Sequence, residues 1–96
     1  MSARILVVDD LAPNRNLLDV KLSAEYYDVL TAESGEEALE IAARERLDLI
    51  LMDAMMPGGM DGFEACRRLK ADPALYHIPV IMVTALDETA DRILCL

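Results

Sequence analysis

Four short apolar runs along the chain predict four buried strands of one parallel sheet. The runs cover residues 5–8, 29–32, 49–52 and 80–83. A strand that is buried on both faces stays apolar along its length and does not alternate with polar residues. Helix-forming stretches separate the runs, and such alternation is typical of βαβ units with right-handed crossovers. The pattern therefore predicts the α/β class with a parallel sheet.

The first predicted helix follows the first strand. Pro13 suits the first turn of a helix, because proline lacks the N–H that a helix start leaves unpaired. The spacing of Leu11, Leu18 and Leu22 predicts one buried face on a helix that ends near Glu25.

Capping signals mark the next two helices. Ser34 and Glu37 match a capping box, in which each side chain accepts from an unpaired backbone N–H, and that helix is expected to end near Arg46. Asp61 is the expected cap of the following helix. A last helix is expected to begin at Thr89. The apolar stripe expected on the helix after Asp61 consists of Phe63, Cys66 and Leu69.

Polar side chains follow three of the four apolar runs. Asp9 and Asp10 follow the first run, Asp53 follows the third and Thr84 follows the fourth. Ligands of open α/β sheets bind beyond the carboxyl ends of the strands, so we expect these groups to meet. Helix capping or simple exposure would explain one such acid, but no structural need explains the coincidence of all of them. On a continuing strand Asp9 and Asp10 would diverge, so at least one is expected to hold an ion.

Three carboxylates at one edge need a compensating cation. Two unit charges about 4 Å apart repel by roughly 1 kcal/mol in water and about 4 kcal/mol at an effective dielectric near 20. Oxygen-only ligands suit Mg²⁺. A carboxylate can also attack phosphorus and form an aspartyl phosphate, and Asp53 stands alone before a flexible loop. The residues therefore indicate a Mg²⁺ site with Asp53 as nucleophile and Thr84 as a donor to a phosphoryl oxygen.

Length and charge restrict the function classes. The 96 residues suffice for one domain, and the net charge of −9 disfavours nucleic-acid surfaces and anionic membranes as partners. No apolar stretch reaches the length of a membrane span, and the first residues have no signal-peptide pattern. The sequence therefore predicts a cytoplasmic domain that binds neither nucleic acid nor membrane.

Read together, these motifs resemble the receiver domain of two-component response regulators along the whole chain. The most specific pieces are residues 5–10, 51–57, 60–62 and 83–85. The first ten residues and residues 24–27 are most similar to the first receiver of diguanylate cyclase regulators. The resemblance implies a flavodoxin-like, doubly wound parallel sheet of order 2-1-3-4-5. Here one C-terminally incomplete domain, residues 1–96, is expected with four strands in the order 2-1-3-4.

The resemblance also implies a role for each site residue. Asp53 would accept a phosphoryl group from a sensor histidine kinase or a phosphotransfer protein. Mg²⁺ would be held by Asp10, Asp53 and the backbone carbonyl of Met55, with Asp9 helping through a water molecule. Thr84 would move toward the phosphate and signal its presence. The output would be a conformational change or dimerisation, so the chain is expected to be a signalling domain and not an enzyme.

Two departures from the family pattern change these expectations. Gly58 and Gly59 lengthen the loop after Asp53 by one residue. The chain also ends before the family's fifth strand and final helix, so the family's phosphate-contacting lysine has no counterpart, and neither Lys21 nor Lys70 matches its position. We expect an exposed edge on the fourth strand, which could support a homodimer or domain-swapped self-association.

Two other functions stay open at this point. A receiver-like fold without the lysine could act as an interaction module that needs no phosphorylation. A phosphohydrolase of the haloacid dehalogenase type would need a second acid two residues after the nucleophile, where this chain has Met55. Met55 and Leu86 flank the expected site and are apolar, so they cannot orient a hydrolytic water. We therefore expect slow loss of phosphate from a phosphorylated domain.

Overall fold

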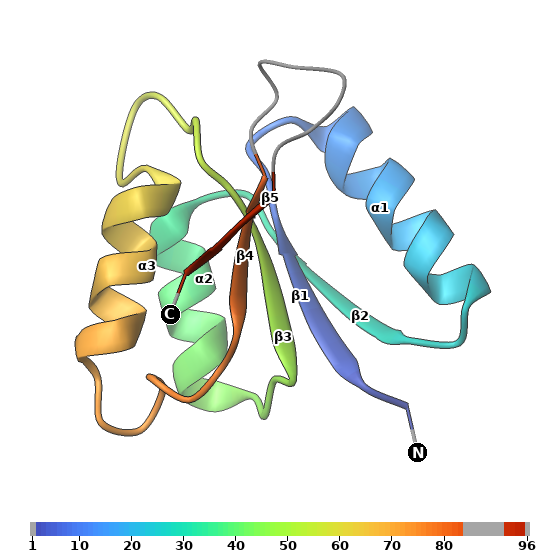
Figure 1. Ribbon diagram of the computed structural model, residues 1–96. Coiled ribbons are helices and arrows are strands. Elements are labelled where there is room, and N and C mark those ends of the chain that lie inside the picture. The colour runs from blue at the N-terminus through green and yellow to red at the C-terminus, as the bar shows by residue number, and fades with distance from the viewer. Residues whose placement is uncertain (1, 84–91, 96) are drawn as a thin grey trace.

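The fold is a sheet in the order β2-β1-β3-β4-β5, with helices on both faces (Figure 1). The computed structural model describes residues 2–83 and the backbone of residues 92–95. Its first four strands are parallel, which confirms the predicted α/β class and the order 2-1-3-4. The strands are β1 (Arg4–Val8), β2 (Asp28–Ala32), β3 (Leu49–Asp53), β4 (Val80–Val83) and β5 (Arg92–Cys95).

The fifth strand corrects two expectations. The helix expected from Thr89 onward is wrong at Arg92–Cys95, where the backbone forms a strand antiparallel to β4. Val80 pairs with Cys95 and Val83 with Arg92, so β5 covers the edge of β4 that was expected to be exposed. The unpaired backbone groups of an edge strand favour such pairing over a short helix. Self-association through a free β4 edge is therefore not supported. Thr89 itself lies outside the described residues.

Three helices cover the sheet unequally. Helix α1 (Ala12–Ala24) lies on one face, and helices α2 (Gly35–Arg44) and α3 (Gly62–Ala71) lie on the other (Figure 1). The expected caps are present. The Ser34 hydroxyl accepts a hydrogen bond from the backbone N–H of Glu37, and Asp61 caps α3 through Glu64 N–H. These caps fix where α2 and α3 begin, directly beside the acidic edge of the sheet.

The hydrophobic core lies between the sheet and helices α2 and α3. Leu6, Ile50, Met52 and Met82 from the three central strands are at most 1% exposed and meet Leu69 of α3 in one cluster. Because side chains alternate along a strand, every second residue of these strands belongs to the opposite face. One face of the sheet therefore contributes most of the fully buried apolar residues.

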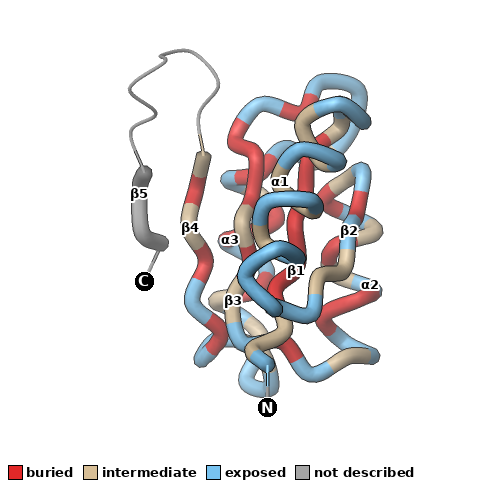
Figure 2. The backbone as a smooth tube through the Cα atoms, turned by 90° about the vertical axis from the view of Figure 1, so that its right-hand side faces the viewer, coloured by how far each residue is buried: buried red, intermediate tan, exposed pale blue. Residues whose placement is uncertain are grey.

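The face beside α1 is open by comparison. None of the residues of α1 is fully buried, and Figure 2 shows the helix as mainly exposed and intermediate. The expected buried stripe is only partly present, because Leu18 and Leu22 are half-buried while Leu11 is 55% exposed. An apolar groove of about 520 Å³ lies here, lined by Ile5, Leu18, Lys21, Leu22, Tyr27, Leu49, Leu51, Ile81 and Val83.

In the described part of the chain, no helix is both long and apolar enough for a membrane crossing.

Candidate functional site

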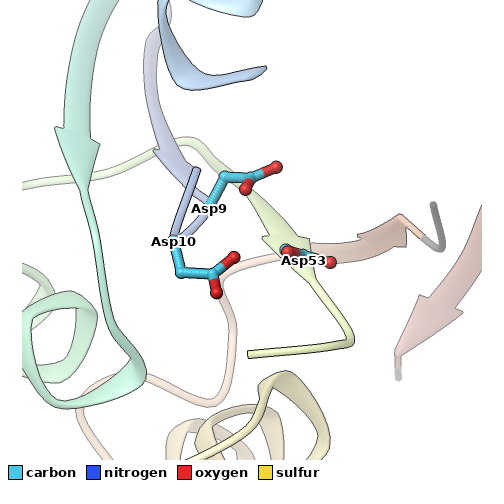
Figure 3. A group of neighbouring side chains, drawn as sticks. All are labelled: Asp9, Asp10 and Asp53. Carbon is cyan, nitrogen blue, oxygen red and sulfur yellow. The ribbon is translucent and has the colours of Figure 1, made fainter. Parts of the chain in front are cut away.

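Three carboxylates converge beyond the ends of β1 and β3. Asp9 and Asp10 follow β1 and Asp53 is the last residue of β3. One oxygen from each residue lies within 4.8 Å of the others, and Figure 3 shows the three side chains as neighbours. The parallel pairing of β1 with β3 brings both strand ends to the same edge. The sequence-based expectation that these acids meet therefore agrees with their placement.

The turn after β1 lets two adjacent aspartates reach the same point. Strand β1 ends at Val8, so the alternation that would separate Asp9 from Asp10 no longer applies. The Asp9 N–H still donates to the carbonyl of Ala32, at 3.1 Å, while the Asp9 carboxylate accepts from Leu11 N–H at 2.9 Å. The expected divergence of Asp9 and Asp10 is therefore absent, because the chain turns at this point.

Asp53 is the most perturbed acid of the group. Its residue is only 7% exposed, and its Oδ1 accepts a hydrogen bond from Met55 N–H at 3.1 Å. The pKa of Asp53 is raised to about 6, mainly by burial and also by the nearby charges of Asp9 and Asp10, while the hydrogen bond from Met55 N–H partly opposes the rise. A perturbed acid beside two others is typical of a functional site.

The donor set fits a hard divalent cation. Asp9 and Asp53 are 8% and 7% exposed, and no ion pair between their carboxylates and a lysine or arginine occurs within the described residues. Closely spaced, poorly solvated carboxylates without a counter-charge are costly unless a cation or proton compensates them. Oxygen ligands of this number suit Mg²⁺, which retains several waters and uses few protein carboxylates.

A cationic side chain that the sequence analysis missed lies beside this cluster. Arg15 on α1 donates from Nη1 to the backbone carbonyl of Asp9 at 2.7 Å, and its Nη2 lies 3.7 Å from Glu33 Oε2. An arginine at the start of the helix that follows the paired aspartates was the available signal. Lys70, in contrast, donates to the carbonyls of Tyr76 and Ile78, in the connection between α3 and β4.

The loop after β3 forms the other wall of the site. Met55 follows Asp53 by two residues, and its residue is 54% exposed. Gly58 has φ +93°, a left-handed conformation that favours glycine. The Met60 N–H donates to Glu36 Oε2 at 3.4 Å, which joins the loop to the start of α2. A cavity of about 420 Å³ between them is lined by Asp10, Glu33, Ser34, Glu36 and residues 56–60. Thr84, the remaining predicted site residue, lies outside the described residues.

Comparisons with known proteins point to one family. The family model of the response regulator receiver domain matches residues 5–96. The chain is 61% identical over 93 residues to response regulator PleD of Caulobacter vibrioides. This match covers 97% of this chain and 20% of that protein. It is 44% identical over 94 residues to the alkaline phosphatase synthesis transcriptional regulatory protein PhoP of Bacillus subtilis, covering 98% of this chain and 38% of that protein. The chain thus spans less than half the length of these curated relatives.

Solved structures agree with the fold. The N-terminal domain of a response regulator receiver protein from Methanoculleus marisnigri superposes with a TM-score of 0.80 at 44% identity, over 82% of this chain and 63% of that one. The chemotaxis protein CheY4 of Vibrio cholerae gives a TM-score of 0.81 at 34% identity, over 85% of this chain and 68% of that one. The four parallel strands, in the order β2-β1-β3-β4, and the described helices therefore have the arrangement of receiver structures.

Proposed function

Because the chain belongs to the response regulator receiver family, whose domains are signalling modules and not enzymes, we propose that Asp53 accepts a phosphoryl group. The donor would be a phosphohistidine of a histidine kinase or phosphotransfer protein. The observation that carries the proposal is the convergence of three carboxylate oxygens within 4.8 Å at one edge of the sheet. Asp53 is the acceptor in this proposal because it stands alone at the end of β3, whereas Asp9 and Asp10 are adjacent residues after β1.

The metal partner in this proposal is Mg²⁺. Asp10, Asp53 and the backbone carbonyl of Met55 would hold it, with Asp9 acting through a water molecule. When bound, Mg²⁺ would neutralise charge on the carboxylates and on the incoming phosphoryl oxygens. The oxygen-only donor set, and the lack of an ion pair to these carboxylates among the described residues, support this assignment.

The transfer step requires positioning more than covalent assistance from the protein. An oxygen of the ionised Asp53 carboxylate attacks phosphorus, and the P–N bond of the donor phosphohistidine breaks. The bonding electron pair stays on the imidazole nitrogen, which then takes up a proton. Thr84 would donate a hydrogen bond to a phosphoryl oxygen and relay the change as a conformational signal. Since such phosphoryl groups derive from ATP, we place the reaction in the cytoplasm.

The test is phosphoryl uptake from a small donor. The chain is incubated with acetyl phosphate and Mg²⁺, and its intact mass is measured. We expect a gain of one phosphoryl group that is lost on treatment with hydroxylamine, because acyl phosphates react with it and phosphate esters do not. Chelation of Mg²⁺ should prevent the gain.

Peptide mapping should place the added group on the segment that contains Asp53. A folded chain that gains no mass under these conditions would contradict the proposal and favour the interaction module that works without phosphorylation. A gain that resists hydroxylamine would indicate an ester on a hydroxyl group and would also contradict it.

The residue at position 55 is expected to set how long the phosphate persists. Met55 is exposed and apolar, and it lies two residues beyond Asp53, so it cannot orient a water molecule toward phosphorus. Replacing it with Asn or Glu supplies a hydrogen-bonding group there. We expect Met55→Asn and Met55→Glu to lose phosphate severalfold faster than the wild type, measured as the decay of the phosphorylated mass after the donor is removed. Met55→Leu is the matched control and should decay as the wild type does.

A further inference from the structure

We propose that Arg15 is a positioning residue that fixes the turn carrying Asp9 and Asp10 in the geometry that binds the metal. The inference rests on the proposed function, because it concerns the same Mg²⁺ site. Arg15 is not itself a ligand, since its guanidinium has only donors. Its effect would be exerted through the backbone of the acidic turn.

The contact that carries this inference is short and involves a charged donor. Arg15 Nη1 lies 2.7 Å from the carbonyl oxygen of Asp9, which is typical of a charge-assisted hydrogen bond. That carbonyl belongs to the peptide between Asp9 and Asp10. Because a peptide is planar, fixing its oxygen also restricts the direction in which the Asp10 side chain leaves the backbone. The Arg15 bond therefore acts on the relative placement of both carboxylates.

Other contacts hold the same turn and the guanidinium in place. The Asp9 N–H donates to Ala32 and the Asp9 carboxylate accepts from Leu11 N–H, so Arg15 completes the set of bonds around this residue. The guanidinium also lies 3.7 Å from Glu33, and the Arg15 side chain is only 17% exposed. Arg15 thereby joins α1 to the ends of both β1 and β2.

Charge and geometry predict opposite effects for Arg15, which makes the inference testable. A fixed positive charge near a cation site repels Mg²⁺, so simple removal of that charge should tighten binding. Loss of an outer hydrogen bond that orients metal ligands instead weakens binding, commonly by 10- to 100-fold. The proposal therefore predicts weaker Mg²⁺ binding when Arg15 is replaced by a neutral residue.

The experiment compares Mg²⁺ dissociation constants, measured by isothermal titration calorimetry at neutral pH, for four proteins. These are the wild type, Arg15→Gln, Arg15→Lys and Arg68→Gln. Arg68 pairs with Glu64 on α3, so Arg68→Gln removes one positive charge and one ion pair away from the acidic turn. We expect about tenfold weaker binding for Arg15→Gln, an intermediate loss for Arg15→Lys, and no loss for Arg68→Gln.

A kinetic measurement separates positioning from general damage to the fold. In the acetyl phosphate reaction, Arg15→Gln should need about tenfold more Mg²⁺ for half-maximal rate, while the rate at saturating Mg²⁺ stays near that of the wild type. If a circular dichroism melt shows that Arg15→Gln is not folded, the same comparison of Mg²⁺ dependence and maximal rate is made with Arg15→Lys, and its result decides the positioning role.

The outcomes for the two proposals are distinct. Equal or tighter Mg²⁺ binding by a folded Arg15 variant overturns the positioning role while leaving the proposed function intact. Weakening of the same size in Arg68→Gln also overturns it, because the effect is then not specific to the turn. Absence of Mg²⁺ binding and of phosphoryl uptake in the wild type overturns the proposed function, and the positioning role with it.

Discussion

Gly62→Ala is expected to destabilise the domain by about 3 kcal/mol or more, the upper part of the range for overpacked sites. A Cβ at Gly62 would contact the carbonyl oxygen of Asp53 and would lie 2.9 Å from Cα of Ala54. Both are backbone atoms at the end of β3, so they cannot move aside as a flexible side chain can. The free energy of unfolding from urea titrations at neutral pH measures the effect.

Gly59→Ala, in the loop just before α3, is the matched control. The atoms nearest to a Cβ there belong to the flexible carboxylate of Glu36, the first at 3.3 Å, so the cost should stay below about 1 kcal/mol. Because the strand end that Gly62 contacts carries Asp53, we also expect Gly62→Ala to weaken Mg²⁺ binding, whereas Gly59→Ala should not. Equal stability of the two variants would show that α3 can shift away from β3 without penalty.

Asp53→Asn is expected to abolish phosphoryl uptake and, without Mg²⁺, to stabilise the domain at neutral pH. The pKa of Asp53 is raised to about 6 in the folded state, from an ordinary value of 3.8, first by burial. The stability gained from protonated Asp53 is therefore fully present below about pH 3.8 and is lost as the pH rises through about 6. Since Asn cannot ionise, the variant avoids this loss, which we expect to be on the order of 1–3 kcal/mol.

Thermal melts across this pH range, with and without Mg²⁺, measure the difference. The advantage of Asp53→Asn should grow as the pH rises from about 4 to 7 in chelator, and added Mg²⁺ should stabilise the wild type more than the variant. Asp19→Asn on α1 removes a carboxylate away from the acidic cluster and should retain the wild-type pH dependence. A pH-independent difference between Asp53→Asn and the wild type would mean that Asp53 ionises without cost in the fold.

The strands and the acidic cluster could be predicted because their signals are local and strong. Each of the four runs became a strand, but only β1, β3 and β4 hold several buried residues, since β2 lies at the sheet edge and buries Ala32 alone. Strand β3 ends on Asp53, the residue that the pattern placed at its end. The caps at Ser34 and Asp61 were also predictable, since serine and aspartate are preferred acceptors for the unpaired N–H groups at a helix start. Parallel pairing then brings the ends of β1 and β3 together, which is why Asp53 could be expected beside Asp9 and Asp10 although it is distant from them in sequence.

The sequence-based predictions fail where contacts between residues distant in sequence outweigh the local pattern of apolar and polar residues. Arg92–Cys95 has helix-compatible residues, but the edge of β4 offers backbone partners that a short helix cannot match. Phe63 fits the stripe expected on α3 yet is 48% exposed, while Ala65 and Leu69 are fully buried. Periodicity alone does not show which side of a stripe faces the sheet. The position of Arg15 at the start of α1 was the available signal, but the sequence does not show that its guanidinium bonds the backbone carbonyl of Asp9.

The unequal covering of the sheet has a consequence for how metal and fold communicate. Of the three described helices, α1 is the one that buries no residue completely against the sheet. The same helix contributes the guanidinium that meets the Asp9 carbonyl. Binding of an ion at the acidic edge and docking of α1 against the sheet would therefore favour each other by thermodynamic linkage. Occupancy of the site would thus affect how firmly α1 is held against the sheet.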